Sequence, residues 1–188
     1  MEKAPFNLKE RKITYKNSVF NVYFDHLEKD GKSLVKDYLV VEPKIKKENG
    51  VSGVAILPKK NNQYGLIKIY RHAISEFTWE VPRGFVDVHE DEVDAAVREL
   101  KEETGIVCLN DDMHSLGYIY PEPGAIAAKV QLFVACIKID NTTNIENELG
   151  HLCFDWFTPE EIDKLIKENK MNDATSQLLY FKHKFDNI

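Results

Sequence analysis

The sequence lacks the features that would tie it to a membrane, a zinc site or a disulfide framework. Its three cysteines are widely spaced and form no Cys-x-x-Cys pair: Cys108, Cys136 and Cys153. An odd number of separated cysteines is typical of buried free thiols in a reducing compartment. Low-complexity tracts and internal repeats are absent, no basic start precedes an apolar segment, and no apolar run approaches the ~18 residues of a membrane-spanning helix. We therefore expect a cytoplasmic protein that does not bind membranes.

A surplus of basic residues is also missing. Lysine and arginine number 25 against 31 aspartates and glutamates, which gives a net charge of −6. Binding to nucleic acid depends on basic surface that meets the phosphates, so we expect no nucleic-acid partner. An anionic small-molecule substrate would have to be met locally, by metal ions and a few positioned cations.

The pattern along the chain predicts two parts. Residues 1–45 contain three stretches rich in β-branched and aromatic residues, which predict strands over Ile13–Asn17, Val19–Leu27 and Ser33–Val41. This strand-rich extension has no obvious core of its own, and we interpret it as a dimerisation element. The polar segment Lys44–Gly50 separates it from a domain that we place at residues 46–188.

The rest of the chain mixes strands and helices without regular alternation. A hairpin is predicted for Val51–Pro58 and Tyr64–Tyr70, with further strands over Phe77–Val81, Ser115–Tyr120, Lys129–Asp140 and Cys153–Phe157. Helices are predicted after Asp91, after Thr158 and over Asp173–His183. This order indicates the α+β class, with a mixed β-sheet between helices in an α/β/α sandwich.

One predicted helix carries an acidic face. Asp91 can cap its start and Gly105 can end it, while Glu99, Glu102 and Glu103 are spaced so that their carboxylates share one side. Clustered like charges repel, and a divalent cation such as Mg²⁺ or Mn²⁺ would neutralise them. The alternative is a solvated helix face, which is what most acidic runs form. A second stripe is the one expected to be buried: Val93, Val97 and Leu100.

The residues around the acidic helix favour the metal-site interpretation. Between Gly84 and Ile106 the chain places, at fixed intervals, Gly84, Glu90, Arg98-Glu99-Leu100, Glu102-Glu103 and Gly105-Ile106. This pattern resembles the complete Nudix hydrolase box. The resemblance implies a Nudix-type fold and metal-dependent hydrolysis of a pyrophosphate bond.

Looser motifs resemble the ADP-ribose pyrophosphatase branch of that superfamily. They are Ile69-Tyr70-Arg71, Trp79-Glu80-Val81-Pro82-Arg83-Gly84 and the proline–glycine loop that begins at Pro121. This similarity implies that ADP-ribose or an ADP-sugar is split into AMP and a sugar phosphate. Ala128-Lys129 departs from the Glu-Arg that many members of the branch carry. Alternative substrates are a GDP-sugar, a dinucleoside polyphosphate, NADH or a capped RNA.

A noncatalytic nucleotide-sensing module is a third possibility from a different class. The presence of all three clustered glutamates argues against it, because a module that has lost catalysis would be expected to have lost at least one of them.

The resemblance also implies roles for residues in and beside the box. Glu99 and Glu103 would be the principal ligands of about two or three Mg²⁺ or Mn²⁺ ions, with Glu102 as a further ligand or a partner of metal-bound water. The backbone carbonyl of Arg83 would be an additional ligand. Arg98 is expected to point away from the centre of the acidic patch and to orient carboxylates by salt bridges.

Glu90 is a candidate partner of Arg98, since a carboxylate can pair with arginine through two parallel hydrogen bonds. Gly84 is expected in a tight turn. Arg71 and Arg83 would each meet a phosphate or a neighbouring acid. Pro121 and Gly124 would belong to the loop that contacts substrate.

The catalytic base is assigned to a polar loop near residue 146. Glu146 would activate water and Glu148 would bind metal, because the Glu-x-Glu spacing looks like the corresponding loop of the ADP-ribose branch. An acidic surface loop is the alternative. The family resemblance further suggests a homodimer in which the N-terminal strands contribute to the interface.

Overall fold

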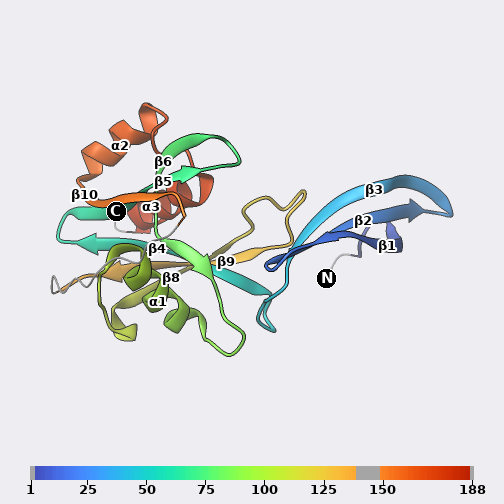
Figure 1. Ribbon diagram of the computed structural model, residues 1–188, viewed down its shortest axis with the longest axis horizontal. Coiled ribbons are helices and arrows are strands. Elements are labelled where there is room, and N and C mark those ends of the chain that lie inside the picture. The colour runs from blue at the N-terminus through green and yellow to red at the C-terminus, as the bar shows by residue number, and fades with distance from the viewer. Residues whose placement is uncertain (1–2, 139–148, 187–188) are drawn as a thin grey trace.

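The chain forms two β-sheets, as seen in a computed structural model that describes residues 3–138 and 149–186. The smaller sheet is antiparallel and extends to one side of the larger body (Figure 1). Its strands lie in the order β1-β2-β3, with bounds Asn7–Lys16, Phe20–Lys29 and Lys32–Pro43. The predicted N-terminal strands are thereby confirmed.

Local chemistry explains this three-stranded sheet. Asp30 and Gly31 both adopt positive φ angles, of 50° and 74°, as a two-residue hairpin turn between twisted strands requires. Arg11 on β1 pairs with Asp25 on β2 through two hydrogen bonds of 2.8 and 2.7 Å, which satisfy a buried carboxylate. The sheet nevertheless leaves large apolar side chains exposed: Leu8, Ile13, Tyr15, Phe24, Leu34, Tyr38 and Leu39.

The larger sheet has seven strands and is mixed. Its main path runs β10-β5-β4-β9-β8, while β6 pairs with β5 and β7 pairs with β4. β4 and β9 are parallel and the other pairs are antiparallel. The strand bounds are β4 Val51–Lys60, β5 Gln63–Arg71, β6 Glu76–Glu80, β7 Arg83–Phe85, β8 Met113–Ile119, β9 Lys129–Cys136 and β10 His151–Phe157. This confirms the mixed sheet that the sequence predicts.

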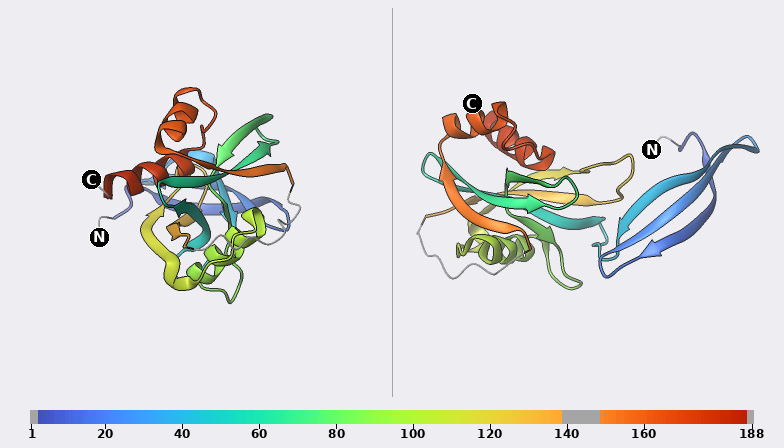
Figure 2. Two further views of the ribbon diagram at one scale, coloured as in Figure 1. Left: turned by 90° about the vertical axis from the view of Figure 1, so that its left-hand side faces the viewer. Right: turned by 45° about the horizontal axis from the view of Figure 1, so that its top comes forward.

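Helices cover both faces of the larger sheet, as Figure 2 shows from two further directions. α1 (Glu92–Thr104) lies on one face, and α2 (Pro159–Lys167) and α3 (Ala174–Asp186) lie on the other. β4 is buried on both sides, with Val54 and Ile56 in the α1 core and Ala55 and Leu57 in the opposite core. The α/β/α sandwich predicted from the sequence is confirmed.

No helix in the part of the chain that the structure describes is both long and apolar enough to cross a bilayer.

Some elements differ from the prediction. β7 and the short 3-10 helix Asn110–Asp112 have no apolar periodicity, so the sequence did not reveal them. β1 begins at Asn7 rather than Ile13, because its first residues pair through their backbone while every side chain stays exposed. The predicted strand that ends at Asp140 stops at Cys136, and residues 139–140 lie outside the described part. The three cysteines are free, but the expectation that they are buried was wrong: Cys108 and Cys136 are half-buried, and Cys153 on the edge strand β10 is exposed.

A loop of the larger body forms hydrogen bonds with the smaller sheet. The Val41 N–H donates to the Ala125 carbonyl at 2.8 Å, and the Ala127 N–H donates to the Val41 carbonyl at 2.9 Å. The Tyr38 hydroxyl donates to the Gly124 carbonyl at 2.7 Å. The loop that follows Pro121 therefore lies against the third strand of the N-terminal sheet.

Candidate functional site

The site is built on α1, whose two ends are fixed as the sequence predicts. The Asp91 carboxylate accepts hydrogen bonds from the backbone N–H groups of Val93 and Asp94, at 2.8 and 3.1 Å. Gly105 ends the helix in the left-handed conformation, with φ 73°. These caps set the register that places the glutamates of the last two turns.

The buried face of α1 differs from the predicted stripe. Ala95, Ala96 and Leu100 are fully buried, whereas Val93 and Val97 are only partly covered. The helix is therefore turned so that two of its glutamates face inward: Glu99 is 7% exposed and Glu103 is 3% exposed. Burying a carboxylate costs folding free energy unless hydrogen bonds and cations compensate its charge. We therefore expect the site to supply such partners to both glutamates.

Gly84 allows the acidic helix to approach the sheet. Gly84 lies in β7, opposite Val54 of β4, and not in the tight turn that the sequence suggested. A Cβ atom at this position would lie 2.1 Å from the Glu99 carboxyl carbon, which is far inside van der Waals contact. Only glycine fits because the carboxylate occupies the space of a side chain.

The second buried glutamate is held by the residue just before Gly84. The Arg83 backbone N–H donates to Glu103 Oε2 at 2.8 Å. This bond satisfies part of the Glu103 carboxylate and fixes it close to β7.

Arg98 links the remaining acids of the box. Its Nε and Nη2 donate to the two oxygens of Glu90, both at 2.8 Å, which is the two-bond pairing that the sequence suggested. Its Nη1 reaches Glu99 at 2.7 Å and Glu102 at 3.1 Å. The expectation that Arg98 points away from the acidic patch was therefore wrong. The Arg98 hydrogen bonds also lower the pKa of the Glu90 carboxyl below its usual value, which keeps it ionised.

The donor set suits a hard divalent cation. Carboxylate oxygens of Glu99, Glu102 and Glu103 are the ligand type that Mg²⁺ and Mn²⁺ prefer, and the pocket for Glu99 exists only because Gly84 has no side chain. Within residues 3–138 and 149–186, no three acidic, histidine or cysteine side chains already stand in a metal-binding arrangement. Arg98 lies among the carboxylates instead, so ion binding would require its Nη1 contacts to yield.

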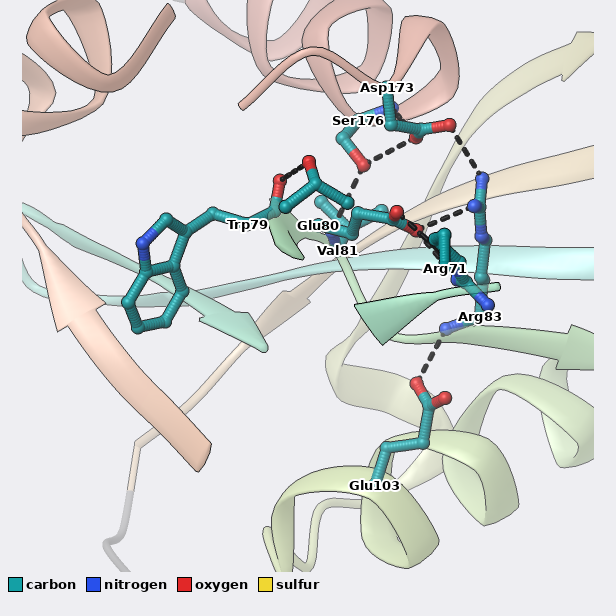
Figure 3. Close-up of polar contacts among 9 residues, drawn as sticks. Arg71, Trp79, Glu80, Val81, Arg83, Glu103, Asp173 and Ser176 are labelled. Carbon is teal, nitrogen blue, oxygen red and sulfur yellow. Dashed lines mark hydrogen bonds and ion pairs between the residues drawn. The ribbon is translucent and has the colours of Figure 1, made fainter. Parts of the chain in front are cut away.

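A second acid–arginine cluster, shown in Figure 3, joins side chains of β5, β6 and β7 and was not predicted as a unit. Its centre is Glu80, which is 1% exposed. Arg71 donates to it through Nε and Nη2, the latter at 2.6 Å, and Arg83 donates through Nη2 at 2.5 Å. The signal in the sequence was a charged residue between Trp79 and Val81 in a short apolar strand.

The cluster continues to the start of α3. Arg83 Nη1 donates to Asp173 Oδ1 at 2.9 Å, and the other Asp173 oxygen accepts from the Ser176 N–H and hydroxyl. Burial raises the pKa of Asp173, but the Arg83 charge and the Ser176 hydrogen bonds lower it by more, and the net shift is downward. Both arginines thus meet neighbouring acids, one of the two roles that the sequence left open.

A cavity of about 300 Å³ opens beside these two clusters. Arg71, Arg83 and Thr175 line it together with Gly84, and Pro121 lies at its wall. The rest of the lining is mostly apolar: Phe20, Val54, Phe85, Ile126, Ala128 and Val130. The predicted residue Gly124 is not part of this lining; its carbonyl bonds Tyr38 instead.

The predicted base and its neighbour lie outside the described residues. Glu146 and Glu148 fall in the segment 139–148, on which the structure gives no account.

The comparisons with known proteins agree with this geometry. The family model of the NUDIX domain matches residues 48–179. An uncharacterised Nudix hydrolase of Schizosaccharomyces pombe is 34% identical over 119 residues, which cover 61% of this chain and 57% of that protein. A Caenorhabditis elegans protein named as a nudix hydrolase is 43% identical over 60 residues, or 31% of this chain and 27% of that protein. The chain thus spans less than two-thirds of the length of these two relatives.

A solved structure shows the same fold over nearly the whole chain. The crystal structure of an ADP compounds hydrolase superposes with a TM-score of 0.78 at 18% identity, covering 98% of this chain and 95% of that one. The fold agrees with the family model, which matches most of the sequence and shows that the chain belongs to the Nudix family.

Proposed function

We propose that the chain is a divalent-metal-dependent pyrophosphohydrolase that splits ADP-ribose or a related ADP-sugar into AMP and a sugar phosphate. The observation that carries the proposal is the pair of buried carboxylates, Glu99 and Glu103, packed against the side-chain-free backbone at Gly84. Burying two acids costs folding free energy. Buried acids beside a cavity lined by arginines are typical of functional sites.

The proposed metal ligands are Glu99, Glu103 and Glu102, with the backbone carbonyl of Arg83 as a further ligand. When bound, Mg²⁺ or Mn²⁺ would neutralise pyrophosphate oxygens and lower the pKa of a water molecule. Without an ion, Arg98 Nη1 holds Glu99 and Glu102, and these two contacts would yield when the ion binds. The two hydrogen bonds to Glu90 would then keep Arg98 beside the acidic face.

Arg71 is the side chain best placed to meet a phosphate. Glu80 occupies its Nε and Nη2, and among the described residues Nη1 has no hydrogen-bond partner. The guanidinium lines the cavity and is oriented by a buried acid, so it would bind an anion with little loss of side-chain entropy.

The cavity also favours a substrate with an uncharged part beyond the diphosphate. Most of its lining is formed by apolar side chains, including Ala128 where many ADP-ribose enzymes carry glutamate. The fold neighbour described as an ADP compounds hydrolase supports an ADP-linked substrate. A GDP-sugar, a dinucleoside polyphosphate, NADH or a capped RNA stays an alternative, as does a noncatalytic nucleotide sensor.

We further propose Glu146 as the base that takes a proton from the attacking water, with Glu148 as an additional metal ligand. Both belong to the segment 139–148 between β9 and β10, where the family resemblance expects such a glutamate.

The N-terminal part, residues 1–45, is proposed as the dimerisation element of a Nudix domain at residues 46–188. Its sheet exposes Leu8, Ile13 and Tyr15 on β1 at 51–64% of their surface. Apolar surface of this kind is common where two chains meet, and a second copy of this chain would cover it.

The first prediction concerns the substrate. Purified protein should release AMP from ADP-ribose or an ADP-sugar in the presence of Mg²⁺ or Mn²⁺, and a chelator should abolish the release. Product analysis over a panel of GDP-sugars, dinucleoside polyphosphates, NADH and capped RNA ranks the alternatives. Nucleotide binding without turnover on any of these compounds would favour the sensor.

Glu103→Gln should abolish most of the activity. The substitution keeps the size and an oxygen that accepts from the Arg83 N–H, but it removes the charge that a metal requires. We expect kcat to fall by an amount that corresponds to about 3 kcal/mol or more. The melting temperature should hold or rise slightly, since a like charge is removed. Wild-type kcat in this variant would refute the metal site.

Glu146→Gln should slow turnover while it leaves metal affinity nearly unchanged. A base acts on the proton of water, so its loss affects the chemical step more than ion binding. Steady-state kinetics and calorimetric titration with Mn²⁺ separate the two effects. If turnover is unaffected, the base is another residue, and Glu148 is the next candidate.

Sedimentation equilibrium should give twice the chain mass of 21.7 kDa at micromolar concentration. Ile13→Glu, on an exposed face of β1, should shift the protein toward monomer, because a charge would be buried without a partner. Leu109→Glu is a matched control on the domain, where the leucine is also exposed. A wild-type mass of one chain would contradict the dimer.

A further inference from the structure

Arg83 is fixed at three points that lie on three different elements. Its Nη2 reaches Glu80 of β6, its Nη1 reaches Asp173 before α3, and its backbone N–H reaches Glu103 of α1 (Figure 3). One residue therefore connects the opposite helical layer of the sandwich to the acidic helix.

The segment that leads into Arg83 is held to the start of α3. The Val81 N–H donates to Ser176 Oγ at 3.0 Å, and this hydroxyl donates to Asp173 at 2.6 Å. Asp173 also accepts from the Ser176 N–H at 2.8 Å, which caps the start of α3. The short connection from Val81 to Arg83 is thus tied to α3 at both of its ends.

The Arg83 side chain is committed to these acids. Both terminal nitrogens of its guanidinium are engaged, and Glu80 and Asp173 neutralise the charges of Arg71 and Arg83 between them. An arginine that binds a phosphate presents a paired edge of N–H groups to it, whereas both outer nitrogens are used here. Its geometry suits orientation of the backbone rather than direct contact with substrate.

The hydrogen bond of the Arg83 backbone N–H depends on how the Arg83 side chain is held. β7 pairs with β4, with Arg83 opposite Ala55, but the Arg83 N–H points to Glu103. A shift of the Arg83 side chain that moves the backbone should lengthen the hydrogen bond from the Arg83 N–H to Glu103.

We propose that Arg83 is a positioning residue, held by Asp173 and Glu80 so that its N–H fixes the Glu103 carboxylate. The start of α3 is thereby part of the support of the acidic site, although it lies on the other face of the sheet. The effect on metal affinity rests on the proposed function, but the hold on the Arg83 N–H does not.

Asp173→Asn tests this in the metal-free protein. Asparagine keeps the size and can still cap α3, but it removes the charge that holds Arg83 Nη1. Amide hydrogen exchange of the Arg83 N–H, followed by NMR, should accelerate by about tenfold. Affinity for Mn²⁺, measured by calorimetry, should weaken by about tenfold, in the range found when the partners of metal ligands are changed.

Asp163→Asn is the matched control. Asp163 is also an aspartate on the α2–α3 layer, where it accepts from Tyr180 and Lys184, but none of its hydrogen bonds reaches β7. It should leave both the exchange of the Arg83 amide and Mn²⁺ affinity at wild-type values. If Asp173→Asn does not fold, Arg83→Lys provides the same test, since lysine cannot reach both acids with a planar fork.

The results separate the two proposals. Unchanged exchange of the Arg83 amide in both Asp173→Asn and Arg83→Lys would overturn the positioning role. Faster exchange with weaker Mn²⁺ binding supports it. Faster exchange in a protein whose wild type neither binds Mn²⁺ nor hydrolyses any substrate would support the positioning role and refute the proposed function.

Discussion

The close approach of the acidic helix to β7 is the constraint that the site depends on. The Glu99 carboxylate occupies the volume where any residue other than Gly84 would place its Cβ, and the Glu103 carboxylate accepts from the neighbouring backbone N–H. Two carboxylates so close to one strand can be held only if cations and N–H groups surround them. The rest of the site supplies these partners.

Two arginine clusters share that task, and they differ in kind. Arg98 acts within the acidic helix and its preceding loop, and it contacts the carboxylates directly. The cluster around Glu80 extends to Asp173 before α3, on the opposite face of the sheet, and it is linked to the Glu103 carboxylate by the backbone N–H of Arg83. Arg98 therefore stabilises the carboxylates by direct charge pairing, whereas the cluster around Glu80 helps to hold the backbone whose N–H binds Glu103.

The sequence predicted the sandwich, the caps of α1 and the pairing of Glu90 with Arg98, because these depend on periodicity and on residues close together in the chain. It missed β7, since three residues carry no periodic pattern, and it misjudged which face of α1 is buried. The link between Arg83 and Asp173 joins residues far apart in sequence, so only the folded chain could show it.

The contact between the N-terminal sheet and the loop after Pro121 restricts which other N-terminal segments could replace this sheet in evolution. Val41 exchanges backbone hydrogen bonds with residues 125 and 127, and Phe20 packs its ring edge against Phe85 at a centroid distance of 5.7 Å. A sheet inherited from another lineage would have to match this loop in register and shape. The extension is therefore not an interchangeable module, and substitutions in the two segments should be coupled among its relatives.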